Sequence, residues 1–195
     1  MIEKQDVIDF FNRHASSWDQ NNVRNDAVIA EILDNACIRP CIRVLDVACG
    51  TGVLIPDYLR RNVSSITAVD LSPEMINIAK RKFPQDNIRW ICGDVETSDT
   101  GADYDAIVIY NALPHFQDPE RLISLLASRL APGGILTVAH GASRETIDAH
   151  HKGPAHKVSV GLMPAADLAA IFAKYLTVTV SLSTDRMYQV AGIRP

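Results

Sequence analysis

The segment VLDVACGTGVL, residues 44–54, decides the fold and raises the first question about function. An apolar run that carries an aspartate is followed by two glycines, Gly50 and Gly52, one residue apart. Glycine allows backbone conformations and a close ligand approach that a Cβ would block. Such a loop can hold a dinucleotide phosphate, hold another nucleotide-like cofactor, or turn a strand tightly into a helix.

Outward from this loop, short apolar strands alternate with helices. Strands are predicted at residues 43–47, 65–70, 88–92, 105–110 and 135–139, and helices over most of 1–40, at 53–61, from Ser72-Pro73-Glu74 onward, and from Asp118-Pro119-Glu120 to near Leu130. The two Pro-Glu starts combine a capping side chain, a first-turn proline and an acid. Pro132-Gly133-Gly134 predicts a turn before the fifth strand. This alternation predicts a parallel sheet covered by helices on both faces.

The C-terminal part follows a different pattern. After a helix that carries Leu168 and Phe172, the runs LTVTVSL (176–182) and MYQVAGI (187–193) are separated by only a few turn-forming residues. Two strands this close pair as an antiparallel hairpin, because a parallel crossover needs about a dozen residues or more. We therefore expect an α/β fold: a Rossmann-like, doubly wound, seven-stranded sheet, mostly parallel, with one reversed strand of the C-terminal hairpin at its edge.

Composition limits the partners. The 195 residues include 19 basic and 23 acidic ones without a basic patch, so nucleic acid is not expected as a partner. No stretch approaches the roughly 18 uninterrupted apolar residues of a membrane helix, and the charged start does not resemble a secretory signal. The four cysteines form no CxxC pair, which favours reduced thiols in a cytoplasmic protein. At this length a single domain is expected.

Three details separate the candidate ligands of the glycine loop. A dinucleotide loop has a third glycine where this chain has Ile55. The carboxylate of Asp46 would repel a pyrophosphate but suits a cationic ligand. Asp70 ends the second predicted strand, 18 residues after Gly52, where an acid can accept both hydroxyls of a ribose. These features describe a nucleoside with a positive, phosphate-free tail, and S-adenosyl-L-methionine fits that description.

Several segments, taken in order, resemble the motifs of one enzyme family. They are VLDVACGTGVL (44–54), AVDLSPEMINIAK (68–80), ICGDVE (91–96), IYNALPHFQDPERLISLLASRLAPGGILTVAH (109–140) and, near the start, FFNRHASSWD (10–19). This set resembles the class I S-adenosylmethionine-dependent methyltransferases, and within them the small-molecule branch that includes the ubiquinone and menaquinone methyltransferases. The segment near the start is similar to the N-terminal lid of that branch.

The resemblance implies a cofactor site at successive strand ends. The implied cofactor-binding residues are Asp46, Ala48, Gly50, Thr51, Gly52, Asp70, Leu71, Met75, Gly93, Asp94, Val95 and Asn111. By this resemblance Asp46 and the loop glycines hold the methionine part, and Asp70 takes the ribose. Asp94 meets the adenine amino group, and Asn111 lies near the methyl. The implied regions are an N-terminal helical lid (1–40), a cofactor-binding core (41–141), a substrate-side insertion (142–163) and a C-terminal helix and hairpin (164–195).

Histidines mark the acceptor side. His115 follows the fourth predicted strand and His140 ends the fifth, so both are expected to contact the acceptor, one of them as a general base. The other candidates for the substrate side are His14, Trp18, Tyr110 and His151. A metal site of His140, Asp148, His151 and His156 is an alternative, but their spacing matches no strong template. We therefore predict no metal, and solvent-facing loop histidines remain the plain alternative for His150 and His156.

The function expected from these observations is transfer of a methyl group from S-adenosyl-L-methionine to a small-molecule acceptor, leaving S-adenosyl-L-homocysteine. Because the flanking segments are short, we expect no extra domain that recognises a nucleic acid or protein. The expected partner is the small-molecule acceptor, with no nucleic acid and no membrane span, and a homodimer is the candidate assembly. Three alternatives stay open: a cofactor-binding regulatory or interaction protein without turnover, a metal- or metalloid-linked methyltransferase that uses the histidine cluster, and a nicotinamide oxidoreductase, which Asp46 and Ile55 disfavour.

Overall fold

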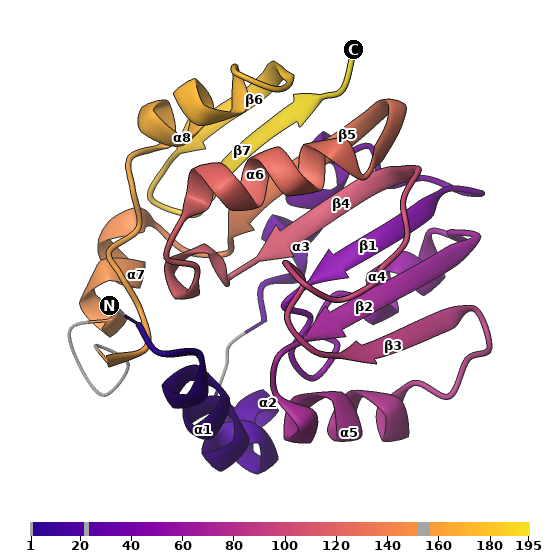
Figure 1. Cartoon of the computed structure of the whole chain (residues 1–195), viewed down its shortest axis with the longest axis vertical. Coiled ribbons are helices and arrows are strands. Elements are labelled where there is room, and N and C mark those ends of the chain that lie inside the picture. The colour runs from indigo at the N-terminus through magenta and orange to yellow at the C-terminus, as the bar shows by residue number, and fades with distance from the viewer. Residues whose placement is uncertain (1, 22–23, 152–156) are drawn as a thin grey trace.

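One mixed sheet organises the molecule. The computed structural model describes residues 2–21, 24–151 and 157–195. Its seven-stranded sheet has the order β3-β2-β1-β4-β5-β7-β6 (Figure 1). The strands are β1 (Arg43–Val47), β2 (Ser65–Asp70), β3 (Ile88–Cys92), β4 (Tyr104–Tyr110), β5 (Leu130–His140), β6 (Thr177–Ser183) and β7 (Tyr188–Ile193). Strands β1 to β5 pair in parallel and β7 runs antiparallel to both its neighbours, which confirms the expected fold class.

Two details of the sheet differ from the expectation. The reversed strand β7 lies between β5 and β6 instead of at the edge, because its hairpin partner β6 pairs on its far side. Strand β5 begins at Leu130 and includes the segment predicted to be a turn. Leu130 pairs with Tyr104 and Ile135 with Ala106, so the segment between them forms a bulge in β5, with Gly133 at φ +77°.

Helices cover both faces of the sheet. They are α1 (Lys4–His14), α2 (Trp18–Asn21), α3 (Asp26–Asn35), α4 (Ile55–Arg60), α5 (Pro73–Lys82), α6 (Pro119–Ser128), α7 (Arg144–His151) and α8 (Ala165–Phe172), with the short 3-10 turns η1 (Ala15–Ser17) and η2 (Leu113–His115). The two predicted helix starts are confirmed, because Ser72 and Asp118 accept hydrogen bonds from the backbone N–H three residues later. The helix after the glycine loop begins at Ile55, two residues later than predicted, and α6 ends at Ser128.

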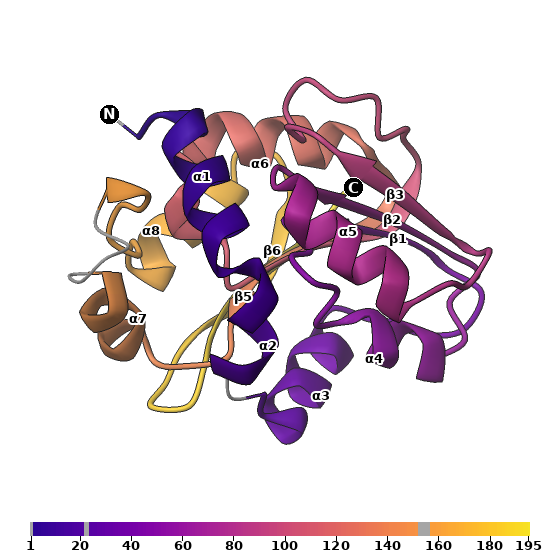
Figure 2. The same cartoon turned by 90° about the horizontal axis from the view of Figure 1, so that it is seen from below.

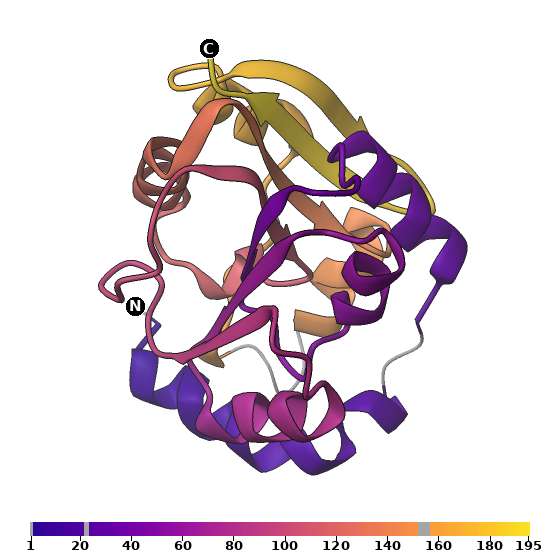
Figure 3. The ribbon, with the colours of Figure 1, turned by 90° about the vertical axis from the view of Figure 1, so that its right-hand side faces the viewer.

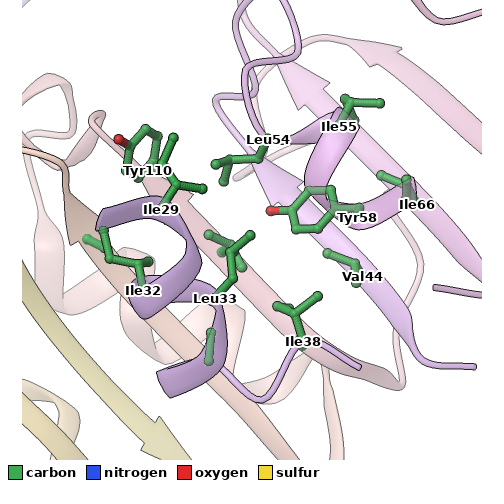
Figure 4. Close-up of a cluster of buried hydrophobic side chains, with 14 of the residues drawn as sticks. Ile29, Ile32, Leu33, Ile38, Val44, Leu54, Ile55, Tyr58, Ile66 and Tyr110 are labelled. Atoms are coloured by element: carbon green, nitrogen blue, oxygen red, sulfur yellow. The ribbon is translucent and has the colours of Figure 1, made fainter. Parts of the chain in front are cut away.

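The core consists of two apolar layers, one on each side of the sheet. Side chains alternate between the faces of a strand, so Val44 packs with α3 and α4 while its neighbour Leu45 packs with α6 and α8. Figure 4 shows the first layer, in which Ile29 and Leu33 of α3 lie beside Tyr58 of α4. Figure 2 shows α3, α4 and α5 on one side of the strands and α6 on the other. These layers leave the strand ends as the place for a site.

The N-terminal helices are attached outside these layers. Figure 3 shows α1 and α2 lying past one end of the sheet, beside α5. A third, small apolar cluster joins them to the rest: Ile2, Val7 and Val158 are buried together, with Phe10, Phe11 and Leu71 packed against them. Within the part of the chain that the structure describes, no helix has the length and apolar character needed to cross a membrane.

Candidate active site

Four neighbouring strands bring the predicted cofactor residues to one end of the sheet. Strands β3, β2, β1 and β4 are parallel neighbours, so the loops that follow them lie at the same end. Direct bonds tie three of these loops together. The N–H of Gly50 donates to Asp70 Oδ2 at 2.8 Å, and the N–H of Gly93 donates to the carbonyl of Asp70 at 2.9 Å. This is the end at which open parallel sheets bind ligands.

The two loop glycines differ in their surroundings. Gly50 and Gly52 both have positive φ, of +56° and +84°, as does Ala48 at +55°. A Cβ on Gly52 would lie 2.9 Å from the ring of Phe83, so close packing requires a glycine there. A Cβ on Gly50 would meet nothing within 4 Å. The space beside Gly50 is therefore open, next to the carboxylate of Asp70.

Two buried carboxyl groups lie under this loop. Asp46 is 2% exposed, and its Oδ2 has no hydrogen-bond partner among the described residues. Burial, together with the charge of Asp70, raises the pKa of Asp46 to about 8. Burial also raises the pKa of Asp70, although the N–H groups of Ser72 and Gly50 that donate to its two oxygens work in the opposite direction. A cation near these groups would favour their ionised forms.

The residues implied for adenine lie around the ends of β2 and β3. Leu71 is half-buried against the small N-terminal cluster, and Met75 and Val95 are buried. A Cβ on Gly93 would collide with the hydroxyl of Ser98. Asp94 accepts a hydrogen bond from the N–H of Glu96 at 2.9 Å and forms an ion pair with Lys4 of α1. The predicted adenine contact is thus paired with the N-terminal segment in this structure.

Polar contacts fasten α1 and α2 over three of the loops. Besides the Lys4–Asp94 pair, Asn12 Oδ1 accepts a hydrogen bond of 2.7 Å from the Ser72 hydroxyl. Asp19 accepts a 2.5 Å hydrogen bond from the Thr51 hydroxyl and pairs with Lys82 at 2.6 Å. The N-terminal helices therefore contact the loops after β1, β2 and β3 in turn. Sequence reasoning missed Asn12, Asp19 and Lys82, because nothing local marks a polar residue that pairs with a distant loop.

An aromatic cluster joins α1 to His115. The ring of Phe11 meets those of His115 and Trp18 edge-on, with centroid distances of 5.0 and 5.3 Å. Phe10 packs against Phe11 at 5.3 Å and against His14 at 4.4 Å. Three predicted substrate-side residues, His14, Trp18 and His115, thus lie in one cluster with Phe10 and Phe11 of α1.

Hydrogen bonds define the tautomers of two of these histidines. His115 Nδ1 lies 2.8 Å from the carbonyl of Val158, and His14 Nδ1 lies 2.7 Å from the carbonyl of Phe10. A carbonyl oxygen only accepts, so in each case Nδ1 is the donor and carries the hydrogen. The neutral ring of His115 then has its lone pair on Nε2, which is the form that a general base needs.

His140 differs from His115 in accessibility. His140 is 1% exposed and its ring meets that of Tyr188 edge-on, 5.8 Å away on the paired strand β7. Nearby, Asn111 Oδ1 accepts a hydrogen bond of 2.9 Å from the N–H of Gly141, and a Cβ on Gly141 would collide with the Tyr110 hydroxyl. The ends of β4 and β5 are therefore closely packed, and His115, in the turn after β4, is half-buried.

The remaining predicted histidines, His151 and His156, lie in the segment between β5 and α8. His151 is the last residue of α7, and its side chain is not described. His156, a ligand in the alternative metal site, lies outside the described residues. Among residues 2–21, 24–151 and 157–195, no cluster of three potential metal ligands is present.

An apolar pocket of about 190 Å³ lies beside η2, the turn that carries His115. Its lining residues are Leu113, Pro114, Gln117, Pro119, Val160, Gly161, Leu162 and Met163. The segment that holds the carbonyl of Val158 continues along this pocket, where the N–H of Val160 donates to the carbonyl of Pro114 at 2.8 Å. The same two segments therefore orient His115 and form the pocket.

Comparison with known proteins gives a consistent picture. Residues 44–134 match the family model described as a methyltransferase domain. The chain is 31% identical over 152 residues to the malonyl-[acyl-carrier protein] O-methyltransferase of Priestia megaterium, covering 74% of this chain and 56% of that one. It is 38% identical over 96 residues to the ubiquinone biosynthesis O-methyltransferase of Coxiella burnetii, covering 48% and 41%. The chain thus spans about half the length of these curated relatives.

Similarity to solved structures extends over the whole chain. The N-methyltransferase NodS from Bradyrhizobium japonicum, in complex with S-adenosyl-L-homocysteine, superposes with a TM-score of 0.76 over 98% of both chains. The sequence identity to NodS is 16%, so this similarity shows a shared fold.

Proposed function

The chain belongs to the class I S-adenosylmethionine-dependent methyltransferases, and from that premise we propose that it transfers a methyl group from S-adenosyl-L-methionine to a small-molecule acceptor. The observation that carries this proposal is the joining of the glycine loop, Asp70 and the loop after β3 by direct hydrogen bonds. A nicotinamide oxidoreductase is disfavoured, because the buried carboxyl group of Asp46 lies where a pyrophosphate would need hydrogen-bond donors.

The residues present fit this cofactor. The open space beside Gly50 accommodates a ligand close to the backbone, and the unpartnered oxygen of Asp46 suits a cationic group. Asp70 lies where a ribose would be held, and each of its oxygens can accept a further hydrogen bond. When bound, the cofactor supplies an electrophilic methyl group on a sulfonium with a good leaving group. The task of the chain is then to align the acceptor and exclude water.

His115 is the proposed general base. Its Nδ1–H is held by the carbonyl of Val158 and its ring by Phe11, so Nε2 has a defined direction and tautomer. The half-buried His115 is the better placed of the two predicted histidines, because His140 is buried and packs against Tyr188. The residues of α1 and α2, which form the proposed lid, close the site from the outside. The apolar pocket beside η2 is proposed to take an apolar part of the acceptor.

The remaining proposals concern the setting of the enzyme. Four free cysteines, three of them exposed, are consistent with a reducing compartment such as the cytoplasm. The division into an N-terminal helical lid (1–40), a cofactor-binding core (41–141), a substrate-side insertion (142–163) and a C-terminal helix and hairpin (164–195) is likewise a proposal. Assembly as a homodimer remains a proposal that size-exclusion chromatography with light scattering would decide.

The test is product formation with a panel of acceptors. The purified chain is incubated with S-adenosyl-L-methionine and with small phenols, carboxylic acids, amines and thiols, and S-adenosyl-L-homocysteine is measured. We expect turnover with at least one class, lost in Asp70→Asn through weaker cofactor binding. Cofactor binding without turnover on any acceptor would favour a regulatory protein, and absence of cofactor binding would overturn the proposal.

A further inference from the structure

The proposed lid, formed by α1 and α2, contacts two different parts of the site. Its polar side chains bind the loops after β1, β2 and β3. A separate face of α1 carries apolar and aromatic side chains: Val7, Phe10, Phe11 and His14 are spaced i, i+3, i+4 and i+7, so they lie on one side of the helix. This face packs on the acceptor side of the site, whereas the polar contacts hold the cofactor loops.

Val158 joins this face of α1 to His115. It is 2% exposed, and its side chain is buried with those of Ile2 and Val7. Its own carbonyl oxygen accepts the hydrogen bond from His115 Nδ1 at 2.8 Å. Within the described residues, the members of this apolar cluster other than Val158 and Leu71 belong to the N-terminal segment. Burial of the Val158 side chain, and with it the placement of its carbonyl, therefore depends on the docked lid.

The segment that carries Val158 is attached to other elements further along. The N–H of Val160 donates to the carbonyl of Pro114 at 2.8 Å, and the N–H of Leu162 donates to Asp148 Oδ1 of α7, also at 2.8 Å. These two bonds fix the segment from Val160 onward without any contribution from the lid. The lid therefore acts on the beginning of the segment, at Val158, which is where His115 is held.

Two further contacts join the N-terminal segment to the turn η2 and the residues after it. The side-chain amide of Gln117 donates to the carbonyl of Ile2, and the Phe11 ring meets the His115 ring edge-on at 5.0 Å. The imidazole of His115 is thus held on two sides, at Nδ1 by the carbonyl of Val158 and at its ring by Phe11. Both contacts require α1 to be docked, the first through the Val158 side chain and the second directly.

We propose that Val158 is a positioning residue through which docking of the N-terminal helices fixes the tautomer and direction of His115. This inference rests on the proposed function, in which His115 is the general base. With α1 docked, Nδ1 donates to the Val158 carbonyl and the basic lone pair lies on Nε2. With α1 undocked, this hydrogen bond loses its support and the ring can carry its hydrogen on either nitrogen. Because the same helix is fastened to the cofactor loops, the base is set only when the lid is closed over them.

The experiment is nuclear magnetic resonance of the full chain, labelled with nitrogen-15 in its histidines, at about pH 8.5, where an ordinary imidazole is neutral. The side-chain nitrogen shifts report which ring nitrogen carries the hydrogen, and the spectrum of His115→Ala identifies the signals of His115. In the wild type we expect the Nδ1–H form. Val7→Asp places a charge in the buried cluster and should undock α1, while the two core layers stay folded because Val7 lies outside them. The His115 signals should then shift toward those of a mixture of the two tautomers.

A control and a second measurement make the test specific. Ser16→Asp adds the same charge at an exposed position of the lid and should leave the His115 signals unchanged. Val158→Ala keeps the backbone carbonyl but trims the side chain on which the lid packs. Because coupling between two sites is reciprocal, amide hydrogen exchange in α1 should become roughly fivefold to tenfold faster in Val158→Ala, with exchange in α6 unchanged.

The proposal is overturned if Val7→Asp keeps the Nδ1–H form of His115 although hydrogen exchange shows that α1 is undocked. Exchange in α1 that stays at the wild-type rate in Val7→Asp or Val158→Ala would also overturn it, because the lid would then not depend on this cluster. A purely structural role of Val158 would lower stability without moving the tautomer. These measurements need no acceptor. Unchanged turnover in His115→Ala would instead contradict the assignment of the base and leave the coupling intact.

Discussion

The loops after β1 to β3 and the N-terminal helices meet at one site but are held in opposite ways. The loops are connected through the backbone: Cys49 N–H donates to the carbonyl of Val69 at 3.1 Å, and Gly93 N–H donates to that of Asp70 at 2.9 Å. The helices α1 and α2 are held by ion pairs, side-chain hydrogen bonds and a small apolar cluster. Backbone bonds within a sheet are hard to open singly, whereas exposed ion pairs contribute little each. The half formed by these loops is thus built to be rigid, and the half formed by α1 and α2, the proposed lid, to be separable.

The largest effect is expected inside the rigid half. Gly52→Ala should lower the free energy of unfolding by about 2–3 kcal/mol, because the new Cβ collides with Phe83 and the backbone has φ +84°. The matched change Gly50→Ala carries only the conformational cost of roughly 1 kcal/mol, since its Cβ meets nothing. Chemical denaturation measures both. Equal losses in the two variants would mean that the loop is not packed as described.

A second prediction addresses the point at which the two halves meet. His115→Ala should reduce kcat by roughly 100-fold for an acceptor that must lose a proton, the lower end of the usual contribution of a general base. Donor affinity should stay within about twofold, because His115 lies outside the cofactor loops and contacts Val158 and Phe11. Steady-state kinetics with separate binding measurements distinguish the outcomes. A variant with normal kcat would remove His115 from the mechanism.

The third prediction concerns stability in the absence of ligand. The pKa of Asp46 is about 8 in the folded protein, against an ordinary value of 3.8, so the unfolded chain loses this proton first as the pH rises. Stability therefore declines from about pH 4 to about pH 8 through this group and then levels off. Asp46→Asn should lack this contribution and have a higher Tm at pH 8, by about 2–4 °C for each kcal/mol gained. A lower Tm than the wild type at pH 8 would contradict the assignment of Asp46 as an uncompensated acid.

The smallest effect is expected in the lid. Lys4→Met removes an exposed ion pair with Asp94 and should change the free energy of unfolding by less than about 1 kcal/mol. It should nevertheless speed donor dissociation, because one of the polar contacts that fasten α1 is lost. Stopped-flow displacement measures this rate, and Lys80→Met, at an exposed position of α5, serves as the control. Unchanged dissociation in Lys4→Met would show that the lid does not limit exchange.

The sequence predicted the rigid half better than the separable one, for physical reasons. A helix start such as Ser72-Pro73, or a loop glycine, depends on interactions between residues a few positions apart. Such local patterns can be recognised in the sequence. The prediction that β7 lies at the edge of the sheet was wrong, because hairpin pairing alone does not say on which side of it β6 lies. The bulge around Gly133 was predicted as a turn, since proline and glycine mark both structures. The pairing of Asp19 with Thr51 depends on how the finished lid docks, and no local pattern carries that information.

The most direct test is calorimetric titration of the full chain with S-adenosyl-L-methionine, and separately with NAD, at pH 7. We expect S-adenosyl-L-methionine to bind at one site per chain and NAD not to bind. Binding of NAD without S-adenosyl-L-methionine, or no binding of either, would contradict the assignment of the strand-end acids and glycines to a cationic nucleoside cofactor.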